Sequence, residues 1–186
     1  MKRIVLASAS PRRREILATA GYTFEIQTAD VDENIHVTDP ELLVRELALL
    51  KAAAGAKKVK GDAYVIGADT VVSLDGEIMG KPADRADAKR MLRALSGKTH
   101  QVFTGVCVLD TADGSATSRS DATHVTFREL TEAEIDAYIA TGEPDDKAGA
   151  YAIQGIGAKL VEKTEGDLNN VIGFPLWLFQ EMIEGK

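Results

Sequence analysis

One carboxylate, Asp69, interrupts an apolar and β-branched run from Ala63 to Val72. Such a run is typical of a strand that is buried on both faces of a sheet. A buried charge costs several kcal/mol unless it is paired or binds a metal ion. Asp69 therefore requires a cationic partner. Burial alone leaves open whether the resulting pair is structural or catalytic.

Five other charged side chains could act together with Asp69: Arg12, Arg13, Glu33, Lys51 and Lys81. Each of them alone also fits a solvated surface position or a structural ion pair. Taken together, two carboxylates and a group of basic side chains meet the needs of nucleoside triphosphate hydrolysis. The carboxylates would hold a divalent cation and deprotonate water, and the basic groups would neutralise the phosphates. The spacing in the sequence does not prove that these residues converge.

The two arginines are predicted to lie at the start of a helix. Residues 3–7 predict a short strand, and Ser10 and Pro11 are typical of the N-cap and first position of the helix that follows. Arg12 and Arg13 then occupy the first turn, where their charge opposes the helix dipole. This mismatch favours an anionic ligand, which backbone N–H groups of the small-residue loop 8–10 could approach.

The remaining segments predict an α/β protein with a mixed, partly antiparallel sheet. A helix from Pro40 to about Ala54 carries Lys51 in its last turns, and the Asp69 strand continues into a hairpin at Asp75-Gly76. Further strands are expected at 23–27, 99–109, 115–127 and 158–163, with helices after residues 84, 131 and 175. Thr131 and Glu134 form a capping box for the second of these helices, and Trp177 of the last one is expected to face inward. The hairpins exclude a purely parallel sheet, and neither the dinucleotide-binding glycine fingerprint nor a Walker A loop is present.

Composition narrows the classes of partner. The net charge of -7 argues against binding to nucleic acid or to an anionic membrane, because the overall field repels polyanions. The single cysteine, Cys107, lies in an apolar alternation and is expected to be a buried thiol. The three histidines are scattered, without the spacing of a zinc site. With no apolar run long enough to span a bilayer and no signal-peptide pattern, a cytoplasmic location is expected.

Across essentially its whole length, the sequence resembles the Maf family of nucleoside triphosphate pyrophosphatases. The motifs that carry this resemblance are 6–13 (LASASPRR), 67–72 (GADTVV), 80–82 (GKP), 95–102 (LSGKTHQV), 142–144 (GEP) and 146–155 (DKAGAYAIQG). The resemblance implies a single domain over residues 1–186, similar to Maf and inosine triphosphatase folds. That fold is an elongated mixed sheet with flanking helices, and two lobes around a cleft. It also implies a homodimer that requires Mg²⁺ or Mn²⁺.

The resemblance further implies a hydrolase of acid anhydrides in which water attacks the α-phosphorus, yielding the nucleoside monophosphate and pyrophosphate. Asp69 matches the family's proton acceptor. The implied catalytic residues are Asp69, Glu33, Lys51 and Lys81, and Glu33 and Asp69 would also hold the metal. Residues implied to bind substrate are Ser8, Ser10 and Arg13 in the phosphate-binding loop and Arg12, Thr70 and Gln154 at positions that set base preference.

Local motifs resemble one branch of the family more than another. Thr70 follows Asp69 and Gln154 precedes Gly155, as in the branch that acts on dTTP and UTP. A hydroxyl and an amide are suitable hydrogen-bond partners for the O4 and N3–H edge of uracil or thymine. Two alternatives stay open: a non-catalytic, nucleotide-sensing regulator of septum formation, and a pyrophosphatase for 7-methyl-GTP or inosine triphosphate.

Overall fold

The computed structural model describes residues 1–185 and contains a seven-stranded mixed sheet with helices packed against it. The strand order is β2-β1-β3-β5-β6-β7, with β4 paired to β3. The strands are β1 (Ile4–Leu6), β2 (Glu25–Ile26), β3 (Tyr64–Leu74), β4 (Glu77–Met79), β5 (Thr99–Asp110), β6 (Ala116–Phe127) and β7 (Val161–Glu165). The α-helices are α1 (Pro11–Thr19), α2 (Pro40–Ala56), α3 (Arg85–Leu95), α4 (Glu132–Ala140), α5 (Leu168–Ile172) and α6 (Leu176–Glu184).

Strand pairing confirms the predicted mixed sheet. Strand β1 runs parallel to both of its neighbours, with Val5 opposite Glu25 of β2 and Val65 of β3. The β3–β4 and β6–β7 pairs are antiparallel. The predicted turn at Asp75-Gly76 joins β3 to β4, and both residues adopt a positive φ, which a tight turn of this kind requires.

The chain forms two compact units. Unit 1 consists of residues 1–69, 104–121 and the segment from Gly173 onward, and unit 2 consists of residues 70–103 and 122–172. Three of the four boundaries fall inside strands β3, β5 and β6, so each of these strands contributes residues to both units. The single domain, the elongated shape and the cleft implied by the family resemblance stay predictions.

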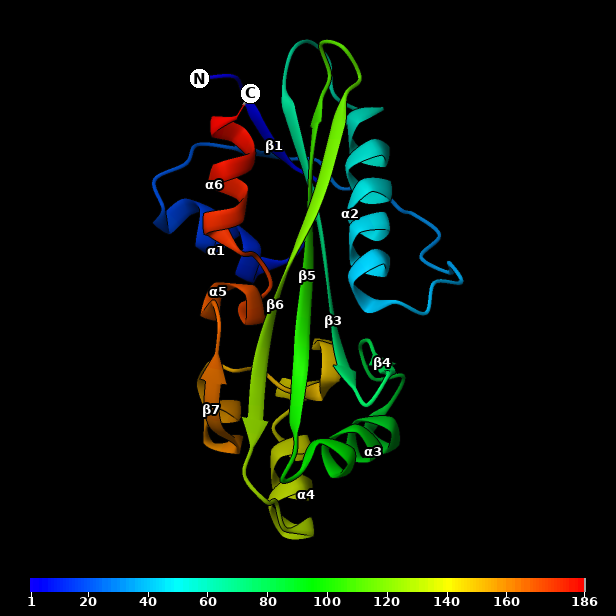
Figure 1. Ribbon diagram of the computed structural model, residues 1–186, viewed down its shortest axis with the longest axis vertical. Helices are drawn as coiled ribbons and strands as arrows, with labels where there is room; N and C mark the ends of the chain where they lie inside the picture. The colour runs from blue at the N-terminus through cyan, green and yellow to red at the C-terminus, as the bar shows by residue number, and fades with distance from the viewer. Residues whose placement is uncertain (186) are drawn as a thin grey trace. The chain divides into compact units, whose positions relative to one another are not determined.

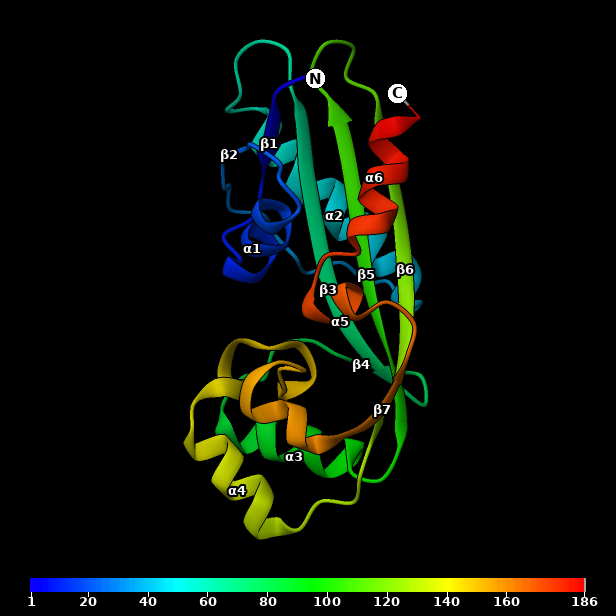
Figure 2. The ribbon, with the colours of Figure 1, turned by 90° about the vertical axis from the view of Figure 1, so that its left-hand side faces the viewer.

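In unit 1, helices cover both faces of the strands. Helix α2 lies on one face, and α1 and α6 lie on the other (Figures 1 and 2). Successive residues of a strand point to opposite faces. Accordingly, Ile66 packs in a cluster with Leu17 and Phe179, whereas Val65 packs in a second cluster with Ala52 of α2. This arrangement confirms that the central part of the 63–72 run is buried on both faces.

Unit 2 has its own core around an aromatic group. His100, Phe127 and Tyr151 pack edge to face, and His100 Nε2 lies 2.6 Å from the Tyr151 hydroxyl oxygen. Burial lowers the pKa of His100 to about 4, so the imidazole is neutral at neutral pH. His100 is therefore a packing residue of unit 2 and is fully buried. Helices α3 and α4 contribute Leu92 and Tyr138 to the same core.

Two local expectations were wrong. Trp177 is 44% exposed instead of facing inward, and its indole N–H donates to Asp121 Oδ2 over 3.0 Å. The strand predicted from residue 158 begins at 161, because residues 155–160 form a 3₁₀-helix.

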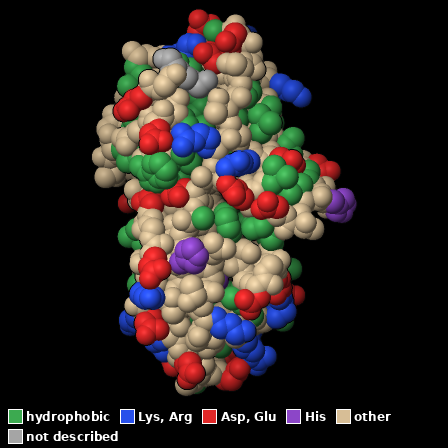
Figure 3. Space-filling model, viewed as in Figure 1, with side chains coloured by type: hydrophobic (Ala, Val, Ile, Leu, Met, Phe, Trp, Pro, Cys, Tyr) green, Lys and Arg blue, Asp and Glu red, His purple; other side chains and the backbone are tan. Residues whose placement is uncertain are grey.

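The surface carries charges of both signs. On the face shown in Figure 3, acidic and basic side chains are intermixed. A polyanionic ligand would therefore have to be held by a few placed cations. Among residues 1–185, no helix combines the length and the apolar character needed to cross a membrane.

Candidate functional site

The side chains of Glu33, Lys51 and Asp69 meet in unit 1. Lys51 Nζ lies 2.6 Å from Asp69 Oδ1 and 2.7 Å from Glu33 Oε1. The Asp69 and Lys51 side chains are 14% and 20% exposed, whereas Glu33 is 54% exposed. The predicted cationic partner of Asp69 is thus present, and it is Lys51. One ammonium joins a largely buried carboxylate to one at the surface.

A close approach between α2 and the sheet positions Lys51 against Asp69. A methyl group on Gly67 of β3 would lie 2.1 Å from the Ala48 carbonyl oxygen and 2.7 Å from the Ala52 amide nitrogen. Since side chains alternate along a strand, Asp69 points to the same face as Gly67, toward α2. Gly105 of β5 is in similar contact with the α2 backbone, 2.2 Å from a carbonyl oxygen by the same measure. Only glycine allows the helix to approach so closely at these two positions.

We expect Gly67→Ala to push α2 away from β3 and to weaken the Lys51–Asp69 contact. Because the added methyl group would meet backbone atoms, the free energy of unfolding should fall by about 1–3 kcal/mol. Urea unfolding measures this change. Gly185→Ala is the matched control, because its added methyl group would meet nothing closer than 3.5 Å. Equal stability of Gly67→Ala and wild type would contradict this account of how Lys51 is placed.

The loop from Ser8 to Arg13 forms a second group of polar contacts in unit 1. Ser8 Oγ accepts hydrogen bonds from Ser10 N at 3.2 Å and from Arg13 Nη1 at 3.3 Å. Ser10 caps α1, because its Oγ accepts from Arg13 N at 3.4 Å. Arg13 Nε also donates to Gly173 O over 2.8 Å, which fixes the guanidinium from a distant part of the sequence.

The arginines and the carboxylates share one electrostatic environment. Burial lowers the pKa of the Arg13 guanidinium, and the negative charges of Asp69 and Glu33 oppose that shift. The positive charge of Arg12 also lowers the pKa of Arg13. Arg13 nevertheless stays protonated, because guanidinium groups do not deprotonate in proteins. Unit 1 therefore brings fixed positive charge and the start of α1 into the neighbourhood of two carboxylates.

The donor set fits a divalent metal of the Mg²⁺ type that binds together with phosphate. Mg²⁺ sites commonly use one or two carboxylates plus substrate phosphates instead of a complete protein cage. Glu33 and Asp69 supply two carboxylates whose oxygens contact the same nitrogen and therefore lie close together. Within residues 1–185, no group of three or more His, Cys, Asp or Glu side chains is placed to hold a metal.

The other predicted site residues belong to unit 2. Thr70 is its first residue and is half-buried, whereas Lys81 and Gln154 are exposed. Next to Lys81, Gly80 O accepts a hydrogen bond from Gly149 N at 3.1 Å. Gln154 directly precedes the 3₁₀-helix Gly155–Leu160. The convergence of Lys81 and Gln154 with Asp69 stays a prediction.

Sequence reasoning missed three positioning features. Gly67, Gly105 and the carbonyl of Gly173 contribute no side-chain chemistry, so a search for reactive residue types passes over them. A signal does exist for the first two, because a lone glycine inside a strand often marks a close backbone approach.

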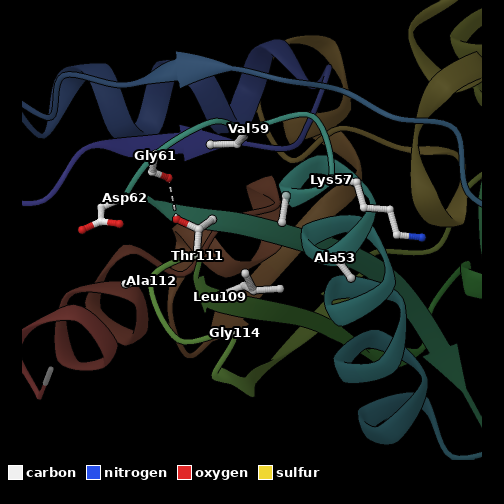
Figure 4. A pocket seen from close by; sticks show the side chains of 10 residues that line it. Ala53, Lys57, Val59, Gly61, Asp62, Leu109, Thr111, Ala112 and Gly114 are labelled. Carbon is white, nitrogen blue, oxygen red and sulfur yellow. Dashed lines mark hydrogen bonds between the residues drawn. The ribbon is translucent and has the colours of Figure 1, made fainter.

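An open depression elsewhere in unit 1 is separate from the predicted site residues. It is lined by residues that include Ala53, Lys57, Leu109 and Thr111, and by none of the predicted site residues. In Figure 4, Lys57 extends away from the other side chains. The Thr111 hydroxyl accepts from Ala63 N at 2.8 Å and donates to Gly61 O at 2.9 Å, so it joins neighbouring chain segments.

Comparisons with known proteins agree with the motifs and the fold. The family model described as "Maf-like protein" matches residues 3–186. A dTTP/UTP pyrophosphatase of Deinococcus radiodurans is 50% identical over 184 residues, covering 98% of this chain and 92% of the relative. A protein of the same name from Moorella thermoacetica is 51% identical, covering 98% and 94%. The solved structure of a HAM1 protein from Coxiella burnetii covers 100% of both chains with a TM-score of 0.55 and 17% identity, which shows the fold alone. The chain therefore belongs to the Maf family.

Proposed function

We propose that this protein is a nucleoside triphosphate pyrophosphatase that hydrolyses dTTP and UTP to the monophosphate and pyrophosphate. The observation that carries the proposal is the Glu33–Lys51–Asp69 cluster beside Arg13 and the start of α1, in a chain about half identical to dTTP/UTP pyrophosphatases. The cluster combines carboxylates for water activation with cations for phosphate binding.

In the proposed reaction, Asp69 accepts a proton from the attacking water. The water oxygen forms a bond to the α-phosphorus, and the bond from that phosphorus to the bridging oxygen of the β-phosphate breaks. Pyrophosphate leaves with the electron pair of the broken bond. Lys51 fixes the Asp69 carboxylate through the 2.6 Å contact, so that the proton acceptor is held in one orientation.

The triphosphate would be held by fixed donors. Arg13 is anchored by Ser8 and Gly173, so little conformational entropy is lost when it binds a phosphate oxygen. The loop 8–10 and the start of α1 offer backbone N–H groups to the same anion. Arg12, Lys51 and Lys81 complete the proposed set of cations.

We extend the proposal to a divalent metal, to base selection and to assembly. Glu33 and Asp69 would hold Mg²⁺ or Mn²⁺, which neutralises phosphate charge when bound. Thr70 and Gln154, with Arg12, would select uracil or thymine through its O4 and N3–H edge. A cytoplasmic homodimer is the proposed form, in line with the family resemblance, and sedimentation would measure its assembly.

A panel of nucleotides tests the proposed activity. Purified protein would receive dTTP, UTP, GTP, inosine triphosphate and 7-methyl-GTP, each with Mg²⁺ or Mn²⁺, and pyrophosphate release would be measured. We expect release chiefly from dTTP and UTP. Release chiefly from purine nucleotides would overturn the substrate assignment. No release from any of them would favour a nucleotide-sensing role.

A further inference from the structure

Two side chains of unit 2 hold the chain segment on both sides of Gln154. The Glu143 carboxylate accepts hydrogen bonds from Gly157 N at 2.9 Å and from Ile156 N at 3.2 Å. The Tyr138 hydroxyl donates to Glu143 over 2.8 Å and accepts from Ala152 N at 3.0 Å. Three backbone N–H groups on the two sides of Gln154 thus donate hydrogen bonds to the side chains of one Tyr–Glu pair. The whole network lies within unit 2.

From this network, we propose that Tyr138 and Glu143 are positioning residues that fix segment 152–157 and thereby help to set the preference for uracil and thymine. The inference rests on the proposed function, in which Gln154 contacts the base. It adds that the orientation of Gln154 is imposed by two side chains that do not themselves contact substrate.

The geometry of the segment explains why such support is needed. Gln154 is exposed, and its side chain makes no capping hydrogen bond to the 3₁₀-helix that follows. Gly155 has a φ of 70°, and a methyl group built on it would lie 3.1 Å from Glu143 Oε2. The segment therefore turns sharply over the Glu143 carboxylate. Without that acceptor the segment would be ordered only upon binding, at a cost in affinity for the base.

The Tyr138 phenol is well suited to the donor role. Its side chain is buried against the core of unit 2, where it packs with Ile135 and Ile139 of the same helix. Burial raises the pKa of the Tyr138 hydroxyl, so the group keeps its proton at neutral pH and donates to Glu143. The same oxygen remains available as the acceptor for Ala152 N.

The variants Tyr138→Phe and Glu143→Gln test the inference. Phenylalanine removes both hydrogen bonds of the hydroxyl, and glutamine replaces one carboxylate oxygen by an N–H donor. The loss of one hydrogen bond that contributes about 1 kcal/mol corresponds to a roughly five- to tenfold change in a binding constant. We therefore expect KM for UTP and dTTP to rise by about that factor, with kcat within about threefold of wild type. KM for purine triphosphates should change little, so the pyrimidine preference falls.

A matched control and a readout independent of turnover complete the design. Ser96→Ala removes another side chain of unit 2 that accepts from a backbone N–H, that of Leu130 at 2.7 Å. It should leave nucleotide preference unchanged. Amide hydrogen exchange at residues 152, 156 and 157 should accelerate in the two test variants and stay as in wild type in Ser96→Ala.

The outcomes separate this inference from the proposed activity. Wild-type preference in both variants, or equal losses for pyrimidine and purine substrates, would overturn the inference. If Glu143→Gln does not fold, the nucleotide preference of Tyr138→Phe alone tests the inference. If the wild type releases no pyrophosphate, the proposed activity fails, and the affinities of the same variants for UTP and GTP, measured by titration, decide the inference.

Discussion

Replacing Asp69 by asparagine should nearly abolish pyrophosphate release while the protein still folds and binds nucleotide. Asparagine keeps the shape of the side chain and can accept a hydrogen bond from Lys51, but it cannot take a proton from water. Lys51 also retains its 2.7 Å contact with Glu33. General-base catalysis contributes roughly 10²–10⁴-fold, so kcat should fall by a factor in that range. Steady-state kinetics and nucleotide titration measure the two properties separately.

The chain provides a close control for Asp69→Asn. Asp110 forms a 2.5 Å ion pair with Lys2, and the exposed fractions of these side chains, 16% and 24%, resemble those of Asp69 and Lys51. Asp110→Asn should retain wild-type turnover, because this pair contains none of the proposed site residues. Normal activity of Asp69→Asn, or an equal loss in both variants, would contradict the catalytic role of Asp69.

Replacing Lys51 by methionine should cost both activity and stability. The change removes the ammonium that contacts both carboxylates, and it leaves Asp69 largely buried beside a second negative charge. Removing one partner of a charged hydrogen bond typically costs about 1–3 kcal/mol, and we expect a loss of that size in the free energy of unfolding. Urea unfolding of Lys51→Met, compared with Lys2→Met, measures the loss at the site.

The same variant tests the proposed metal site by stability alone. With Lys51 absent, Mg²⁺ or Mn²⁺ no longer competes with an ammonium for Glu33 and Asp69, so its binding should stabilise the folded protein more. The increase in Tm on adding Mn²⁺ should therefore be larger in Lys51→Met than in wild type. An identical increase in Lys51→Met, Lys2→Met and wild type would contradict metal binding at these two carboxylates.

Local sequence signals predicted most of the elements. Ser10 and Pro11 marked the start of α1, and Thr131 with Glu134 forms the expected capping box of α4. These signals succeed because a cap or tight turn is decided by a few adjacent residues. Trp177 was misplaced because its environment depends on Asp121, more than fifty residues away. Helical periodicity contains no information about such a partner.

The candidate site was predictable only in part, for the same reason. The need of Asp69 for a cation followed from the apolar run around it, but Lys51 fitted a surface position equally well. The pairing of Lys51 with Asp69 depends on the contact of Gly67 with the α2 backbone. That contact is recognisable only once β3 and α2 are known to pack together. The expected role of Gln154 came from the family resemblance, since an exposed glutamine carries no physical signal of its own, and Lys81 gave only the weak signal of a lysine in a turn between glycine and proline.

The course of β3 restricts how the length of this chain can vary in related proteins. Asp69 ends the first segment of unit 1, Thr70 begins unit 2, and Val72 and Leu74 belong to the core of unit 2. Because side chains alternate along a strand, one residue inserted after Asp69 would turn Val72 and Leu74 toward the opposite face. A deletion of one residue would do the same. Length variation is therefore compatible with the tips of turns, such as residues 112–114, whereas β3 must keep its residue count between Gly67 and Leu74.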